Sequence, residues 1–103
     1  MYKRQIYKWP VIYPALGLHS ESGEVAGKIK KMIRDEEVAF DGSLVITPQQ
    51  RADLGAELGD VLWYIAALSK DLGLTLEELG QMNLDKLADR KMRGKLKGSG
   101  DHR

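Results

Sequence analysis

Hydrophobic side chains recur every three or four residues along two long stretches of the chain. The first stretch runs from Pro14 to about Arg34, and the second runs from Pro48 to about Leu72. Such spacing places the apolar side chains on one face of an α-helix and leaves the other faces polar. The pattern therefore predicts two long amphipathic helices, with apolar positions at Leu18, Val25, Ile29 and Met32 in the first and Leu54, Leu58, Val61, Ile65, Leu68 and Leu72 in the second.

Two short motifs mark where helices begin. In Thr47-Pro48-Gln49-Gln50 the Thr hydroxyl can accept a hydrogen bond from a free backbone amide of the first turn. The Gln50 side chain can accept one from the Thr47 amide, which completes a capping box, and Pro suits the first helical position. Thr75-Leu76-Glu77-Glu78 repeats the motif and predicts a third helix that ends near Gly94. Gly73, between the two helices, can adopt the left-handed conformation that ends the second one.

The remaining segments predict shorter elements. Residues 1–12 are an amphipathic lead-in, expected as a short helix that Pro10 ends. The helical period is lost over residues 35–46, where Asp41-Gly42 between apolar triplets predicts a small hairpin at 38–46 or an ordered loop. We therefore predict an all-α domain over residues 1–93, a helical bundle of three main helices plus the short N-terminal one, followed by a flexible basic tail over 94–103.

The two long helices carry the same acidic pattern. Leu18-x-x-Glu21-x-Gly23-Glu24-Val25-x-x-x-Ile29 aligns with Leu54-x-x-Glu57-x-Gly59-Asp60-Val61-x-x-x-Ile65, with five identities and one exchange of acid for acid. At about 100° per residue, each acidic pair lies on the same side of its apolar stripe. Packing of the helices as a hairpin would therefore bring the four acids, Glu21, Glu57, Glu24 and Asp60, to one edge of the core.

Four carboxylates at one edge would repel one another unless a cation neutralised them. Hard oxygen ligands with no Cys and no cluster of His favour Mg²⁺, with Mn²⁺ as a substitute, and such sites hold polyphosphates. The alternative is that these acids are ordinary solvated carboxylates, with Glu24 and Lys28 forming a pair at i, i+4. The duplicated pattern is what favours a site over this alternative.

Composition narrows the function classes. The chain has 103 residues, no Cys and a net charge of +1, so disulfides, thiolate zinc sites and a Cys nucleophile are excluded, and no overall charge points to nucleic acid or a membrane surface. A pattern typical of a signal peptide or a membrane span is also missing, which leads us to expect a cytoplasmic protein with no membrane partner.

At these acids the sequence resembles the MazG-like nucleoside triphosphate pyrophosphohydrolases of the all-α NTP pyrophosphatase superfamily. The resemblance spans roughly residues 13–93. It rests on three segments, Glu21-x-x-Glu24, Glu57-x-x-Asp60 and Asn83-x-x-Lys86-x-x-x-Arg90. The interval between the two acidic segments is longer than in compact members, because residues 35–46 are added.

The resemblance implies hydrolysis of NTP or dNTP to the monophosphate and pyrophosphate, in nucleotide pool control or house-cleaning. It assigns the catalytic and metal-binding roles, with Mg²⁺ as cofactor, to Glu21, Glu24, Glu57 and Asp60. It places the nucleotide against Asn83, Lys86 and Arg90. It also implies a homodimer or homotetramer, with sites completed between subunits.

Further candidates come from the residues themselves. Tyr64, on the acidic side of its helix, can stack on a base or pack at a contact, and Trp63 beside it is expected to pack. Lys31, two turns after Glu24, is a candidate phosphate ligand. Two rival functions stay open: a phosphoribosyl-ATP pyrophosphohydrolase, and a non-catalytic helical module that binds nucleic acid or protein through the basic segment 90–97. The lack of interleaved aromatics argues against nucleic acid.

Overall fold

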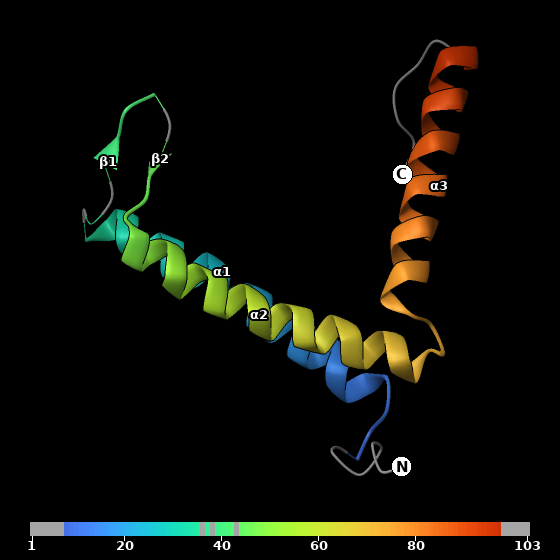
Figure 1. Ribbon diagram of the computed structural model, residues 1–103, viewed down its shortest axis with the longest axis horizontal. Coiled ribbons are helices and arrows are strands. Elements are labelled where there is room, and N and C mark those ends of the chain that lie inside the picture. The colour runs from blue at the N-terminus through green and yellow to red at the C-terminus, as the bar shows by residue number, and fades with distance from the viewer. Residues whose placement is uncertain (1–7, 36, 38, 43, 98–103) are drawn as a thin grey trace.

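The computed structural model describes residues 8–35, 37, 39–42 and 44–97. The elements follow in the order α1 (Ile12–Arg34), β1 (Ala39–Phe40), β2 (Leu44–Val45), α2 (Pro48–Asp71) and α3 (Leu76–Lys97) (Figure 1). The all-α prediction is confirmed. The short N-terminal helix falls mostly on residues 1–7, outside the described residues, and residues 8–11 form bends and turns rather than a helix.

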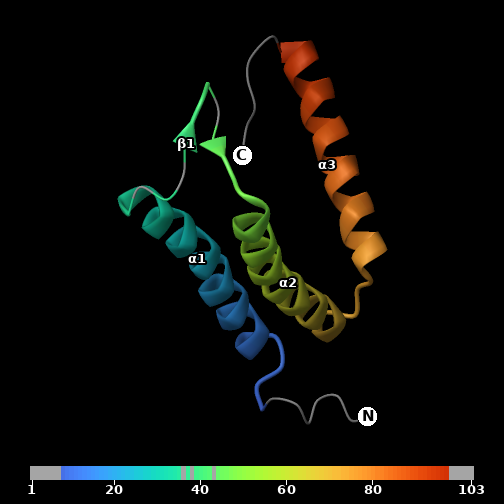
Figure 2. The same ribbon diagram turned by 60° about the vertical axis from the view of Figure 1, so that its left-hand side comes forward.

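The two long helices pack side by side and antiparallel, as Figure 2 shows most clearly. Pro14 and Met32, close to the two ends of α1, are its buried residues. The backbone N–H of Val11 donates a 2.8 Å hydrogen bond to Asp71 Oδ2, which ties the beginning of α1 to the end of α2. The predicted hairpin of helices is therefore present.

The segment that joins α1 to α2 is the small antiparallel hairpin predicted from the Asp-Gly pair. Ala39 pairs with Val45 and Phe40 with Leu44. Gly42 has a φ of 76°, a left-handed conformation that glycine adopts without the Cβ clash of other residues. Gln50 Nε2 also donates a 2.8 Å hydrogen bond to the Glu37 carbonyl, so the connection is anchored to the first turn of α2.

The helix boundaries confirm the capping motifs and correct one predicted end. At α2, the Gln50 amide donates to Thr47 Oγ1 and the Thr47 amide donates to Gln50 Oε1, a complete capping box. Thr75 and Glu78 form the same reciprocal pair at α3. Gly73 ends α2 with a φ of 75°. The prediction that the third helix ends near Gly94 is wrong: α3 continues to Lys97, because the good helix formers around this glycine outweigh its roughly 1 kcal/mol penalty. The predicted tail over 94–103 is therefore helical up to Lys97, and its remainder, 98–103, lies outside the described residues.

The third helix diverges from the other two. Within the described residues it packs on the end of α2 only near its own beginning and does not contact α1 (Figures 1 and 2). The Cα radius of gyration is 18.2 Å, whereas a compact chain of this length has about 13 Å. Large apolar side chains consequently stay exposed, among them Leu16, Leu58, Leu62, Leu84 and Met92. None of the described helices has a stretch apolar and long enough to cross a membrane.

Candidate metal and nucleotide site

Three of the four predicted acids meet on one side of the α1–α2 hairpin. One carboxylate oxygen each from Glu21, Glu57 and Asp60 lies within 4.8 Å of the other two. Glu21 comes from α1, whereas Glu57 and Asp60 stand one turn apart on α2. Glu21 and Glu57 are half-buried and Asp60 is exposed, so the group is open to solvent on one side. We call these three residues the acidic cluster.

Glu24, the fourth predicted acid, is exposed and does not belong to the acidic cluster. It follows Glu21 by three residues on α1, which rotates its side chain about 60° away from that of Glu21. Its charge nevertheless reaches Glu21 and contributes to raising the pKa of that group. The structure therefore brings three of the four acids together and leaves the fourth beside them.

Lys28 supplies a positive charge to this group across the hairpin. Its Nζ lies 3.4 Å from Glu57 Oε2, with the lysine side chain 39% exposed and the glutamate 19% exposed. The sequence suggested a pair between Lys28 and Glu24 on the same helix, whereas the structure pairs Lys28 with Glu57 on α2. The sequence did not predict this pair, because the spacing of charges along a chain identifies only neighbours within one helix.

The acids perturb one another. Desolvation between the two helices raises the pKa of Glu21 above its ordinary value, and the charges of Asp60, Glu57 and Glu24 raise it further, in that order. Proximity of like charges favours the protonated form of one member of such a group. A bound cation would reverse this effect, since it favours the charged form of every carboxylate it contacts.

Two aromatic side chains, Trp63 and Tyr64, lie next to the acids, and we call them the aromatic wall. An open pocket of about 370 Å³ is lined by Glu21, Asp60, Trp63 and Tyr64. The Trp63 ring stands nearly perpendicular to that of Tyr64, at 84°, with 5.0 Å between ring centroids. The pocket therefore combines carboxylates with aromatic rings, which are groups that can meet the cation-bound phosphates and the base of one ligand.

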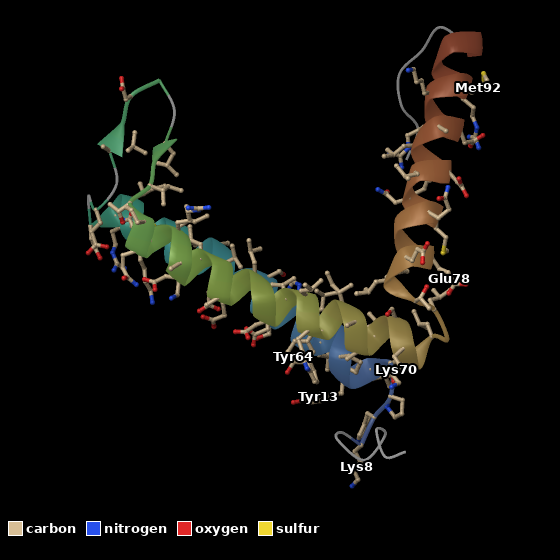
Figure 3. The ribbon with its side chains drawn as sticks, viewed as in Figure 1. Lys8, Tyr13, Tyr64, Lys70, Glu78 and Met92 are labelled. Carbon is tan, nitrogen blue, oxygen red and sulfur yellow. The ribbon has the colours of Figure 1, made fainter. Side chains whose placement is uncertain are left out.

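Tyr13 of α1 is a neighbour of Tyr64 that the sequence did not single out. Their ring centroids are 6.3 Å apart, and both side chains lie at the same end of the hairpin in Figure 3. The hydrogen bond between their hydroxyl groups raises the pKa of Tyr64, and desolvation adds to this shift. Tyr64 is thus held in place and uncharged. Its helical position pointed to the acids, but only the folded hairpin reveals Tyr13.

The other predicted ligands lie elsewhere in the single chain. Lys31 is exposed on α1 and is not among the residues that line the pocket. Asn83 and Lys86 are exposed and Arg90 is half-buried, all on α3. Because the described part of α3 contacts only the end of α2, one chain does not bring these residues to the acidic cluster.

The donor set of the acidic cluster suits a hard divalent cation. Carboxylate oxygens are the ligands that Mg²⁺, Mn²⁺ and Ca²⁺ prefer, and their close spacing is compatible with one cation bridging them. Cations of this kind polarise phosphate oxygens and lower the pKa of water. The arrangement is therefore able to support phosphoryl chemistry on a ligand that the neighbouring pocket accepts.

Comparison with known proteins agrees with this chemistry. The family described as the MazG nucleotide pyrophosphohydrolase domain matches residues 14–94, which include most of α1, all of α2 and most of α3. The chain is 50% identical over 91 residues to the "Gene 37 protein" of Mycobacterium phage L5, covering 88% of this chain and 75% of that protein. No solved structure matches the chain significantly.

Proposed function

Because the chain belongs to the MazG nucleotide pyrophosphohydrolase family, we propose that it hydrolyses nucleoside or deoxynucleoside triphosphates to the monophosphate and pyrophosphate, with Mg²⁺ as cofactor. Family membership supports a pyrophosphohydrolase in general. The nucleotide substrate, the metal and the residue roles are our proposal. Mn²⁺ is expected to substitute for Mg²⁺, since both accept oxygen ligands in similar geometry.

The observation that carries the proposal is the convergence of Glu21, Glu57 and Asp60 within 4.8 Å beside a pocket with an aromatic wall. Carboxylates alone are common on protein surfaces. Here they come from two helices, they repeat one sequence pattern, and they adjoin a surface suited to a base. The three features together support a site for a metal–triphosphate complex.

The proposed reaction joins a water oxygen to the α-phosphorus and breaks the bond from that phosphorus to the bridging oxygen. Pyrophosphate leaves, and the proton lost by the water passes to a carboxylate of the site. The acidic cluster holds the cation, and Glu24 stands beside it as a fourth ligand or proton acceptor. When bound, Mg²⁺ neutralises phosphate charge and lowers the pKa of the attacking water.

We assign nucleotide contacts to residues around the acids. Tyr64 provides a face for the base, and Lys31 contributes positive charge on the α1 side. Asn83, Lys86 and Arg90 meet the sugar and the phosphates, with the Arg fork and the Lys ammonium suited to different phosphate oxygens. Since α3 stands away from the acidic cluster of its own chain, we assign this contact to α3 of a second copy.

The proposed assembly is a homodimer or homotetramer, and the exposed apolar surface supports it. Leu58 and Leu62 of α2 are each 56% exposed, and Leu84 of α3 is 60% exposed. Asn83, Leu87 and Arg90 are spaced four and three residues apart, so they lie on one face of α3. If that face is buried against another copy, Asn83 and Arg90 lie at the interface together with Leu87.

A hydrolysis panel tests this function. Ribo- and deoxynucleoside triphosphates are incubated with and without Mg²⁺, and pyrophosphate is resolved from orthophosphate. Metal-dependent formation of monophosphate and pyrophosphate supports the proposal and identifies the preferred nucleotide. If only phosphoribosyl-ATP is cleaved, that compound takes the place of the proposed triphosphate substrate. If no nucleotide is cleaved, the enzymatic function is refuted and a helical binding module is favoured.

A further inference from the structure

The ring of Tyr64 lies directly on the backbone of α1 at Gly17. A Cβ atom built on Gly17 would lie 2.5 Å from Tyr64 Cδ1 and 2.6 Å from Cζ, and still closer to Cε1. Carbon atoms in van der Waals contact are about 3.5–4.0 Å apart. Any side chain at position 17 would therefore displace the ring from its present position.

Five other helical glycines lack such a close approach. A Cβ at Gly23, Gly27, Gly55, Gly59 or Gly80 would meet nothing within 4 Å. Glycine lowers the stability of a helix interior relative to alanine. At Gly17 this cost has a structural reason, because the missing side chain is the space that the Tyr64 ring occupies.

The other sides of the Tyr64 ring are also constrained. The Tyr13 hydroxyl is hydrogen-bonded to that of Tyr64, with the rings inclined at 55°. Trp63 packs edge to face at a centroid distance of 5.0 Å. The position of Tyr64 is thus fixed by the α1 backbone at Gly17, the Tyr13 hydroxyl and the Trp63 ring. Figure 3 shows Tyr13 and Tyr64 close together.

This contact lies one helical turn from the acids on both helices. Gly17 precedes Glu21 by four residues on α1, and Tyr64 follows Asp60 by four residues on α2. Glu21, Asp60 and Tyr64 line the same pocket. The position of the ring on Gly17 therefore sets the distance between the aromatic wall and the acidic cluster.

We propose that Gly17 is a positioning residue that, together with Tyr13, holds Tyr64 as the wall on which the flat base of the nucleotide stacks. The proposal rests on the proposed function for the identity of the ligand. A methyl group at position 17 pushes the ring toward the pocket and removes the stacking surface, while the acids and their ability to bind a cation stay unchanged.

The test measures binding of an α,β-methylene nucleoside triphosphate, which resists the proposed cleavage, so it does not depend on turnover. Trp9→Phe leaves Trp63 as the single indole reporter, and its emission follows binding in the presence of Mg²⁺. The base is taken from the preferred substrate, or each base is tried in turn. The variants are Gly17→Ala, Tyr64→Ala, their combination, and Gly27→Ala as the control on the same helix.

We expect Gly17→Ala and Tyr64→Ala each to raise the Kd for the analogue about tenfold, in the range of one lost aromatic stacking contact. Gly27→Ala is expected to bind like the parent. In the Tyr64→Ala background, Gly17→Ala is expected to have no further effect, since its action passes through the ring. Binding of Mn²⁺ alone, followed by electron paramagnetic resonance, is expected to be equal in all folded variants.

The proposal would be overturned if Gly17→Ala left the Kd for the analogue unchanged. It would also be overturned if Gly17→Ala raised the Kd tenfold in the Tyr64→Ala background as well. Absence of analogue binding to the parent would overturn it as well. The proposed function fails on a different result, the lack of any pyrophosphate release. Circular dichroism checks that the variants fold. Tyr64→Phe, which keeps the ring but loses the hydrogen bond to Tyr13, is expected to bind the analogue with an affinity between those of the parent and Tyr64→Ala.

Discussion

Lys28 of α1 and Glu57 of α2 form an ion pair across the helical hairpin, with 3.4 Å between Nζ and Oε2. The pair lies at the edge of the acidic cluster, because Glu57 is one of its three members. The ammonium group therefore offsets part of the negative charge concentrated there. A divalent cation at the same carboxylate would be repelled by this positive charge, so Lys28 links the stability of the hairpin to its cation affinity.

Replacement of this lysine separates the two effects. Lys28→Met is expected to lower the free energy of unfolding of the metal-free protein by up to about 1 kcal/mol, the range of partly exposed ion pairs. It is also expected to raise the affinity for Mn²⁺ by up to about tenfold, because two like-signed ions a few ångströms apart no longer repel. Urea unfolding and calorimetric titration with Mn²⁺ measure the two quantities.

The control is Lys30→Met, which removes the same charge from an exposed position two residues along α1. It changes net charge equally and is expected to leave Mn²⁺ affinity nearly unchanged. Equal effects of the two substitutions would show that Lys28 acts only through overall charge and not through its contact with Glu57.

Glu21 predicts a dependence of stability on pH. Its pKa is raised in the folded protein, chiefly by desolvation and then by the neighbouring acids, so the folded state binds the proton more tightly than the unfolded chain. This stabilising contribution is full below the ordinary pKa of a glutamate and is lost as the pH rises through the folded value. Ionised Glu21 therefore weakens the metal-free hairpin at neutral pH.

The variant Glu21→Gln should raise the Tm of the metal-free protein at pH 7 and lose this advantage near pH 4, where the wild-type side chain is protonated. Thermal unfolding in a chelating buffer at the two pH values measures the difference. The same variant is also expected to lose activity by at least about 10- to 100-fold. Losses of this size follow even from mutations of residues that only support a metal ligand, whereas Glu21 is itself a proposed ligand. A lower Tm for the variant at pH 7 would contradict the assigned cause of the pKa shift.

The capping box of α2 gives a prediction that concerns stability alone. Thr47→Ala removes the acceptor for the Gln50 amide, a 3.1 Å hydrogen bond, and leaves that amide at the free end of the helix. We expect the free energy of unfolding to fall by about 1 kcal/mol, measured in urea. Because Thr47 is ten residues from Glu57, kcat of the folded protein should stay as in the wild type.

Local features of the chain were predictable from its sequence. Thr47, Thr75 and Gly73 act within one turn, and their capping and left-handed conformations appear as expected. The repeated acidic pattern predicted a shared edge because helix geometry fixes which side of each helix an acid occupies. It did not predict that Glu24 stays outside the acidic cluster, since this depends on how far each helix is rotated about its axis.

Contacts between the helices required the structure. Lys28 reaches Glu57, and Tyr64 rests on Gly17, because two specific turns of α1 and α2 are level with each other. A sequence pattern gives the faces of each helix but not this relative position. The orientation of α3 was likewise not predictable, because its apolar face has few partners within the described chain.

The exposed face of α3 predicts an assembly that one substitution disrupts. Leu87 is 46% exposed and lies on the face that carries Asn83 and Arg90. Leu87→Glu is expected to convert a dimer or tetramer into a species near the 11.5 kDa of one chain, measured by sedimentation, because burial of a charge at such an interface is unfavourable. Gln81→Glu adds the same charge about 120° around the helix and should leave the assembly intact. A monomeric wild-type protein would refute the assembly.

Pyrophosphate release as a function of Mg²⁺ concentration, measured for the wild type, Glu57→Gln and the control Glu77→Gln, tests the central claim most directly. Glu77 is exposed in the first turn of α3 and is not part of the acidic cluster. We predict that release requires Mg²⁺, that Glu57→Gln weakens the Mg²⁺ dependence and the rate by about 10- to 100-fold or more, and that the control matches the wild type. Release without Mg²⁺, or a Glu57→Gln curve that coincides with the wild type, would contradict the account.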